Sequence, residues 1–198
     1  MKYVFNVIKS IKSNLNRYKI IVTKSTVPVT TGDKITKILK SNKNKNKFDV
    51  VSNPEFLREG SAINDAQNPD RIVIGYADEI AKKTLIDLYE PYKCTKLECI
   101  PRTAELIKYA SNAFLAVKIS YINQMADLCE KVGANIDDIA KGMGLDKRIG
   151  NKFLHTGPGY GGSCFPKDTL ALVKTANQFK SEVSIIEETI KYNDLRKA

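Results

Sequence analysis

Short apolar runs alternate with helical patterns over the first hundred residues. Each run is at most six residues long and ends at proline, glycine or a polar turn. This pattern is typical of strands buried in a parallel sheet. We expect strands around Ile20–Val22 and within 48–56 and 71–75, and helices over 1–16, 32–40 and 78–92. This alternation of helix and strand predicts an α/β fold with a parallel sheet.

The second half of the chain has a different pattern. From Thr103, a candidate N-cap, no glycine or proline interrupts the sequence before Gly133, so the pattern predicts one long helix over 103–132. Further helices are expected over 135–144, from about Pro166 to 179, and near 182–196. The long helix therefore joins a partial parallel sheet to a part of the chain that we expect to be all-helical.

Composition excludes some classes of function. The chain of 198 residues has a net charge of +10, and many of its lysines lie in the tract KSNKNKNK (40–47). This tract contains neither aromatic residues nor arginine, so it indicates a solvated loop, and we do not expect nucleic-acid binding. No apolar run is long enough to span a membrane.

Cysteine usage bears on metal sites and on the cellular compartment. The four cysteines form no CxxC pair and the chain has one histidine, His155, so no metal site is expected. Because no disulfide framework is evident, we expect a reducing, cytoplasmic location.

Cys164, in the stretch GGSCFPKD (161–168), has the surroundings of a reactive thiol. Pro166 suits the first turn of a helix, which places Cys164 at a helix N-terminus, where the helix dipole favours a thiolate and lowers the thiol pKa. Lys167 adds positive charge. The alternative is a buried structural cysteine, and the local sequence does not decide between the two.

The stretch GPGYGG (157–162) matches the dinucleotide fingerprint G-x-G-x-x-G literally. That fingerprint indicates phosphate binding only after a strand and within a βαβ unit. Helical sequence precedes it here, so we reject it as a cofactor loop.

Four motifs occur together in a specific order. They are KSTVP (24–28), NPEFLREGSAINDAQNPDRIVIG (53–75), AELIKYASNAFLA (104–116) and LDKRIGNKFLHTGPGYGGSCFPKDTLAL (145–172). In this order they resemble the nucleotide-sugar 6-dehydrogenases of the UDP-glucose/GDP-mannose dehydrogenase family, and the members that oxidise UDP-glucose most closely. The resemblance covers nearly the whole chain.

The resemblance implies a domain organisation. Residues 1–102 resemble the second half of an N-terminal dinucleotide-binding domain of Rossmann type, and residues 103–198 resemble the central helical domain, which carries catalytic residues and forms the dimer. A homodimer through helix 103–132 is therefore implied. The chain is expected to be truncated relative to the family, because the opening glycine fingerprint, its acidic ribose ligand and the C-terminal UDP-binding domain have no counterpart.

Members of the family oxidise the CH2OH group of a nucleotide sugar to a carboxylate in two NAD-dependent steps, and the resemblance implies the conversion of UDP-glucose to UDP-glucuronate. By resemblance, Cys164 is the nucleophile that forms a thiohemiacetal and then a thioester, while Lys108 and Asn112 stabilise the developing alkoxide. Glu59, with Glu55, Thr26 and Asp168, is expected to act on the hydrolytic water. Substrate-binding candidates are Phe56, Leu57, Arg58, Lys108, Asn112, Arg148, Phe153, Tyr160 and Gly161. Cofactor-binding candidates for NAD are Thr26, Glu55 and Lys167.

Simpler interpretations remain open for several of these residues. Lys108 is also interpretable as a solvated helix lysine, Glu55 and Glu59 as surface carboxylates, and Asp168 as a partner of the helix dipole. For the whole chain, the alternatives are an inactive remnant or dimerisation module of a split gene, and a dehydrogenase for GDP-mannose or UDP-N-acetylmannosamine.

Overall fold

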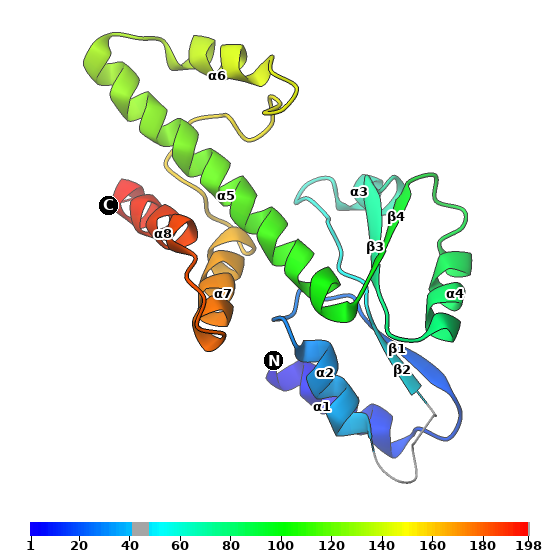
Figure 1. The fold of residues 1–198 in the computed structure, drawn as a ribbon. Coiled ribbons are helices and arrows are strands. Elements are labelled where there is room, and N and C mark those ends of the chain that lie inside the picture. The colour runs from blue at the N-terminus through cyan, green and yellow to red at the C-terminus, as the bar shows by residue number, and fades with distance from the viewer. Residues whose placement is uncertain (41–47, 198) are drawn as a thin grey trace. The chain divides into compact units, whose positions relative to one another are not determined.

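The computed structural model describes residues 1–40 and 48–197, and Figure 1 shows their fold. The chain forms two compact units, Met1–Lys108 and Tyr109–Ala198. The predicted lysine–asparagine loop falls almost entirely outside the described residues. The functional division at residue 102 that the sequence suggests stays a proposal.

The first unit is built on a four-stranded sheet in the order β1-β2-β3-β4. The strands are β1 (Lys19–Thr23), β2 (Phe48–Ser52), β3 (Arg71–Gly75) and β4 (Thr95–Cys99). The β1–β2 and β3–β4 pairs are parallel, whereas β2 meets β3 antiparallel through the single pair Ser52–Gly75. The predicted α/β fold is confirmed, and its sheet is mostly rather than wholly parallel. Strand β4 was not predicted.

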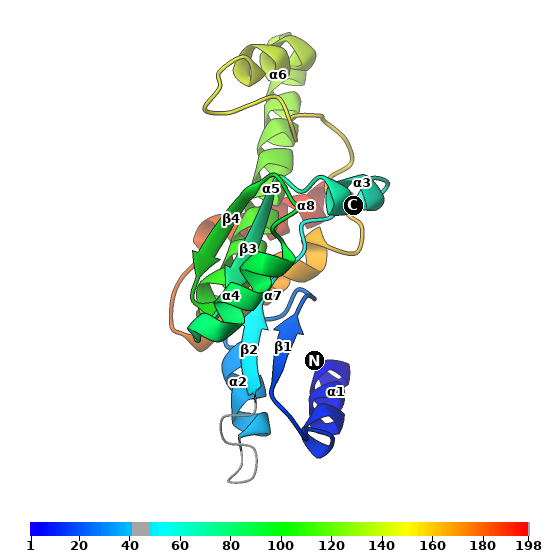
Figure 2. The same cartoon turned by 90° about the vertical axis from the view of Figure 1, so that its right-hand side faces the viewer.

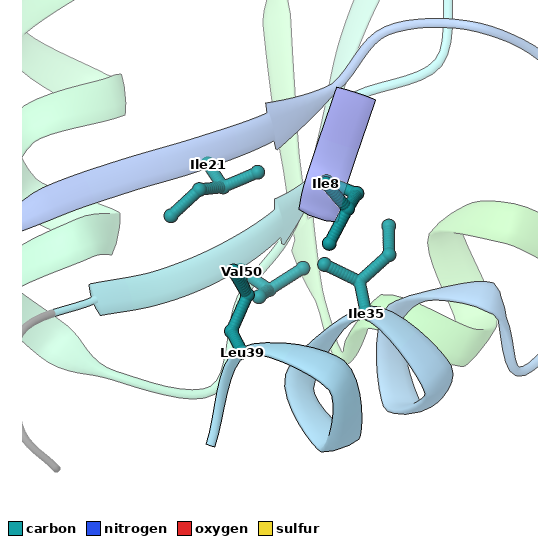
Figure 3. Packing of buried hydrophobic residues seen from close by; sticks show 5 residues of the cluster. All are labelled: Ile8, Ile21, Ile35, Leu39 and Val50. Carbon is teal, nitrogen blue, oxygen red and sulfur yellow. The ribbon is translucent and has the colours of Figure 1, made fainter. Parts of the chain in front are cut away.

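Helices cover both faces of this sheet. They are α1 (Lys2–Ser13), α2 (Thr31–Leu39) and α4 (Glu79–Leu88). The short helix α3 (Ala62–Gln67), which was not predicted, follows β2 in the chain. On one face, Ile8 of α1 and Ile35 of α2 pack with Ile21 and Val50 (Figure 3). On the other face, α4 packs over β2 and β3 in a cluster that includes Val51 (Figure 2). Because successive strand residues point to opposite faces of a sheet, Val50 packs in the cluster on one face and Val51 in the cluster on the other.

All regular elements among the described residues of the second unit are helices, as predicted. Helix α5 spans Pro101–Val132 and crosses the boundary between the units. It is followed by α6 (Ile136–Gly144), α7 (Phe165–Gln178) and α8 (Ser184–Lys197). The prediction of Thr103 as N-cap was wrong: its backbone N–H and that of Ala104 both donate to the Ile100 carbonyl, so the helix begins before Thr103. Pro101 is tolerated there because the first helical N–H groups have no intrahelical partner.

The first turns of α5 are fixed to the first unit. The buried carboxylate of Glu105 accepts hydrogen bonds from the backbone N–H groups of Thr30 and Gly32, both at 2.7 Å, at the start of α2. Burial raises the pKa of this carboxyl, and the two N–H groups oppose the rise. At the end of β3, a side chain on Gly75 would lie 2.5 Å from the Ala104 side chain, so only glycine permits this approach of helix to strand.

Within the described residues, no helix is long and apolar enough to cross a lipid bilayer.

Candidate active site

Each compact unit holds part of the predicted residue set. In the first unit, Asn53 fixes the start of the segment that follows β2. Its fully buried amide donates to the Val73 carbonyl at 2.7 Å and accepts from the Lys24 ammonium at 2.9 Å and the Tyr89 hydroxyl at 2.5 Å. One side chain thereby connects the residue after β1, the middle of β3 and the residue after α4. Because a buried amide without these partners is costly, the position of the following residues is well determined.

Lys108 is buried, with 5 % of its surface exposed, so its interpretation as a solvated helix lysine was wrong. Its ammonium lies 3.4 Å from a Glu55 carboxylate oxygen and 5.2 Å from the centre of the Phe56 ring. A buried cation needs such partners because its desolvation is unfavourable. The structure therefore brings three of the predicted residues together: Glu55, Phe56 and Lys108.

The rest of the segment after β2 bonds internally. The Leu57 N–H donates to the Glu55 carboxylate at 2.8 Å, and the Arg58 N–H donates to Asp65 of α3, also at 2.8 Å. The Arg58 guanidinium is paired with the same Asp65, which raises the pKa of Arg58. Both predicted substrate-binding amides thus have protein acceptors here.

Glu59 and Thr26 are more exposed than the buried Lys108. Glu59 is exposed, and no described residue forms an ion pair with it. Thr26 is partly exposed in the connection between β1 and α2. Since β1 and β2 run parallel, Thr26 and Glu55 both follow strands at their carboxyl ends, the edge where open α/β sheets bind ligands.

In the second unit, Cys164 is the residue that immediately precedes α7, and Pro166 stands in the first turn, as predicted. The thiol is exposed, so the alternative of a buried structural cysteine was wrong. The Ser163 hydroxyl oxygen lies 3.7 Å from the Cys164 sulfur. Gly161 and Gly162 are exposed as well, which leaves the backbone before the thiol accessible to a ligand.

One turn further along α7, Asp168 is buried with 1 % of its surface exposed. The Asn112 amide of α5 donates to one of its carboxylate oxygens at 2.6 Å. The Lys167 ammonium lies 3.2 Å from the other oxygen, which accepts no hydrogen bond from the described residues. Asp168 is therefore more than a partner of the helix dipole, because it fixes the Asn112 amide and keeps one oxygen free of hydrogen bonds.

The remaining predicted substrate residues differ in exposure. Arg148 is an exposed side chain paired with Asp146 at 2.6 Å. Phe153 and the buried Tyr160 both make edge-on ring contacts with Phe165 of α7, at centroid distances of 6.2 and 6.3 Å. The Tyr160 side chain thus belongs to the packing around the first turn of α7, and burial raises the pKa of its hydroxyl.

The loop 157–162 lies between α6 and α7, so the strand that must precede a dinucleotide fingerprint is missing there. Across residues 1–40 and 48–197, no group of three His, Cys, Asp or Glu side chains is placed to hold a metal ion.

Residues 1–93 match the NAD binding domain of the UDP-glucose/GDP-mannose dehydrogenase family, and residues 102–195 match its central domain. The chain belongs to this family. It is 54% identical to the UDP-glucose 6-dehydrogenase of Rhizobium meliloti (strain 1021) over 202 residues, which cover 100% of this chain and 46% of the relative. A UDP-glucose 6-dehydrogenase of Bacillus subtilis (strain 168) is 50% identical over 98% of this chain and 42% of its own length.

Solved structures agree with this membership of the UDP-glucose/GDP-mannose dehydrogenase family. The UDP-glucose dehydrogenase of Pyrobaculum islandicum superposes with a TM-score of 0.93 at 42% identity, covering 98% of this chain and 46% of that chain. The UDP-N-acetylmannosamine dehydrogenase of Pyrococcus horikoshii superposes with a TM-score of 0.85 at 25% identity. The chain therefore spans about half the length of the family members that it matches.

Several polar residues that shape the site were not predicted from the sequence. They are Asn53, Asp65, Glu105, Asn193 and Arg196. Asp65 bonds to the nearby Arg58, whereas the other four bond to residues distant in sequence. Of these residues, only Asn53 could have been identified from the sequence. It directly follows a predicted strand and precedes a proline, at the edge of the sheet where open α/β folds bind ligands.

Proposed function

We propose that this chain carries the nucleophile and the polar catalytic residues of an NAD-dependent UDP-glucose 6-dehydrogenase. The observation that carries the proposal is the exposed Cys164 at the start of α7, followed one turn later by the buried Asp168 that holds Asn112. UDP-glucose is favoured over GDP-mannose and UDP-N-acetylmannosamine because relatives that are 47–54% identical are UDP-glucose 6-dehydrogenases.

The proposed reaction converts the sugar CH2OH group to a carboxylate. One CH2OH group, one water and two NAD+ give one carboxylate, two NADH and three protons. Bound NAD+ supplies the hydride acceptor for both oxidations. Thr26 and Glu55 fit its nicotinamide end, because they offer a hydroxyl and a carboxylate at the carboxyl edge of the parallel β1–β2 pair. Lys167, whose side chain is 60% exposed, offers a cation for a phosphate group.

Cys164 acts twice in this scheme. Its thiolate attacks the aldehyde carbon, which forms a C–S bond and moves the carbonyl electron pair to oxygen as a thiohemiacetal. Loss of hydride from that carbon leaves a thioester, and water then breaks the C–S bond and restores the thiol. Exposure of Cys164 meets the first requirement of this role, which is access to the substrate.

Lys108 and Asn112 are assigned to the developing oxyanion. They are four residues apart on α5, so both side chains leave the same face of the helix. A cation and an amide N–H that are already held by Glu55 and Asp168 need little reorganisation when charge develops on the substrate oxygen.

Hydrolysis of the thioester requires a general base. We assign this role to Glu59, with Glu55 and Thr26 orienting the water and Asp168 holding Asn112. Exposure of Glu59 leaves its carboxylate free to accept a proton from water. Arg148, Phe153, Gly161 and the backbone of Phe56–Arg58 are assigned to substrate binding.

We further propose a cytoplasmic homodimer formed through α5 and α6. Three large α5 side chains spaced seven residues apart are exposed: Phe114 by 63%, Tyr121 by 45% and Leu128 by 50%. Helix α6 is amphipathic, yet none of its residues is buried. An apolar surface of this kind favours a second copy of the chain. All four cysteines are free, which suits a reducing compartment.

The test uses a fusion in which residues 1–198 replace the matching segment of the Rhizobium meliloti enzyme. We expect the fusion to reduce NAD+ with UDP-glucose, measured at 340 nm, at a ratio of two NADH per sugar. Cys164→Ala should abolish the overall reaction, since no thioester can form, and Cys94→Ala should leave it intact. The 198-residue chain is assayed in parallel with millimolar NAD+.

The results distinguish the proposal from its alternatives. Preference of the fusion for GDP-mannose or UDP-N-acetylmannosamine would assign the chain to a different nucleotide sugar. A correctly folded fusion with no turnover on any of the three sugars would support the inactive remnant instead.

A further inference from the structure

The glycine-rich loop 157–162 is held by side chains from two helices of the second unit. The Gly157 N–H donates to the Asn123 side chain of α5 at 2.9 Å, and the Gly157 carbonyl accepts from Arg196 of α8 at 2.7 Å. Asn123 is fully buried, and Arg196 is partly buried. Both polar groups of the Gly157 backbone are therefore bonded to side chains rather than to secondary structure.

Tyr160 is held in the same way by a single residue. The Tyr160 N–H donates to the Asn193 side-chain oxygen at 2.7 Å, and the Asn193 amide donates back to the Tyr160 carbonyl at 3.1 Å. Asn193 is 2% exposed. Among ordinary side chains, an amide offers an acceptor and a donor side by side in this geometry, so aspartate or leucine cannot replace both bonds.

The loop conformation depends on this contact. Gly159 has φ +114°, and a side chain there would lie 2.6 Å from the Asn193 oxygen. Glycine therefore lets the loop pass directly over the Asn193 amide. On the other side, the Tyr160 ring packs edge-on against Phe165, which follows Cys164 in the chain. Asn193 of α8 thus contacts Tyr160, and Tyr160 in turn contacts Phe165 in the first turn of α7.

Arg196 is itself oriented by neighbours. Its guanidinium is paired with Asp127 of α5 at 2.5 Å, and the Tyr192 hydroxyl donates to the other oxygen of Asp127 at 2.6 Å. The Arg196 guanidinium, which donates to the Gly157 carbonyl, is thereby also fixed by Asp127. A loop held by preformed contacts loses less conformational entropy when it binds a ligand.

From these contacts we infer that Asn193 is a positioning residue for substrate binding, with Arg196 and Asn123 in supporting roles. It fixes the backbone of Tyr160, so that the exposed Gly161–Ser163 segment next to Cys164 has one conformation before substrate binds. The inference rests on the proposed function, since it takes the loop as the segment that receives the sugar nucleotide. It assigns a role to α8, a helix with no predicted site residue.

Asn193→Ala and Asn193→Asp are compared with Thr189→Ala. Thr189 is buried on α8, one turn before Asn193, and its hydroxyl donates only to the Ile185 carbonyl of the same helix. Its replacement perturbs α8 without touching the loop, so it controls for a merely structural effect. Lys191→Ala is the exposed control on the same helix.

The first measurement is amide hydrogen exchange in the 198-residue chain without ligand. In Asn193→Ala we expect exchange at the Tyr160 amide to accelerate by about tenfold or more, while amides within α5 keep their protection. Asn193→Asp, which retains the acceptor alone, should give a smaller acceleration. Thr189→Ala should leave the ratio of Tyr160 exchange to α5 exchange unchanged.

The second measurement is the KM for UDP-glucose in the fusion described above. Asn193→Ala should raise KM by about tenfold with a smaller change in kcat. Part of the free energy of substrate binding is then used to order the loop, which weakens the observed binding. Unchanged exchange at Tyr160, or a KM effect shared equally by Thr189→Ala, would overturn the inference. Failure of the wild-type fusion to turn over would count against the proposed function alone, because the exchange measurement needs no activity.

Discussion

At the scale of single residues, the polar side chains of the candidate site are held by one another. Lys108 pairs with Glu55, and Asn112 donates to Asp168. Buried polar groups are tolerated only with hydrogen-bond or charge partners. Each pair therefore also fixes the orientation of the Lys108 ammonium or the Asn112 amide. Cys164 differs from these residues because it is exposed, with its sulfur 3.7 Å from the Ser163 hydroxyl oxygen.

The difference between the cysteines predicts their reactivity. Cys164 is exposed, Cys129 is 4% exposed, and burial raises the pKa of Cys99, which lowers its thiolate fraction at neutral pH. At pH 7 we expect iodoacetamide to modify Cys164 first, roughly tenfold or more faster than Cys129. Mass-spectrometric mapping of early labelling measures this. Labelling led by Cys94, Cys99 or Cys129 would contradict the placement of Cys164.

Gly159 offers a test of the loop conformation. Gly159→Ala places a side chain 2.6 Å from Asn193 at a φ of +114°, so we expect it to destabilise the chain by roughly 2 kcal/mol. Gly157→Ala is the matched control, because a side chain at Gly157 meets no atom within 4 Å. Thermal unfolding of the two variants measures the difference. Equal melting temperatures would show that the loop does not adopt this conformation.

At the scale of elements, long-range polar contacts connect helices that are far apart in sequence. Glu105 of α5 accepts from the first turn of α2, and Asp127 of α5 binds Tyr192 and Arg196 of α8. Such contacts carry charge, so they make the packing of elements depend on pH.

Asp127 predicts the direction of this dependence. Hydrogen bonds from Tyr192 and then from Arg196 lower the pKa of Asp127. A lowered folded-state pKa contributes stability that is present above the unfolded value, about 4, and is lost as the pH falls through the folded value. The urea midpoint of the wild type should exceed that of Asp127→Asn at pH 7.

The same comparison at about pH 3 should give a smaller difference, because Asp127 is then largely protonated in the unfolded chain, and this proton uptake favours unfolding of the wild type. Asp87→Asn, at an exposed position on α4, is the control and should shift the midpoint little at either pH. A difference between wild type and Asp127→Asn that grows on acidification would contradict the assignment.

Prediction from the sequence succeeded for elements with a strong pattern and failed for those without one. Strand β3 was predicted at its observed limits, since RIVIG contains the continuous apolar run Ile72–Ile74 and is closed by Gly75. Strand β4, TKLEC, alternates charged residues because it is the edge of the sheet and is largely exposed, so it gave no apolar signal. Helix α3 has only six residues, too few for a helical period to be visible.

The candidate site was predictable only as far as its motifs. The motif around Cys164 gave both the residue and its position at a helix start. Burial of Lys108, in contrast, depends on contact with Glu55 and Phe56, which are about fifty residues away in sequence. The contact between Asn193 and Tyr160 likewise joins residues whose separation no local pattern records. Long-range polar pairing is decided by tertiary structure, which a single sequence does not reveal.

At the scale of the whole molecule, exposed apolar side chains on α5 and α6 predict self-association. We expect a homodimer at micromolar concentration in light scattering. Phe114→Glu and Tyr121→Glu should each shift the mass towards the monomer, because a charge in an apolar interface is desolvated without a partner. Ile80→Glu, at an apolar position on α4 that is 64% exposed, should not. A folded wild-type monomer under these conditions would refute the dimer.

The contacts of Glu105 also bear on how genes of this family can recombine. A crossover just before Pro101 would take Ala104 and Glu105 from one parent and Gly75, Thr30 and Gly32 from the other. Any parent with a bulkier residue at position 75, or without the carboxylate at 105, would leave the first turn of α2 unbonded or push α5 away from β3. A crossover within α5 after Lys108 keeps these partners together. Viable natural hybrids should therefore exchange sequence inside the long helix, rather than at the loop that precedes it.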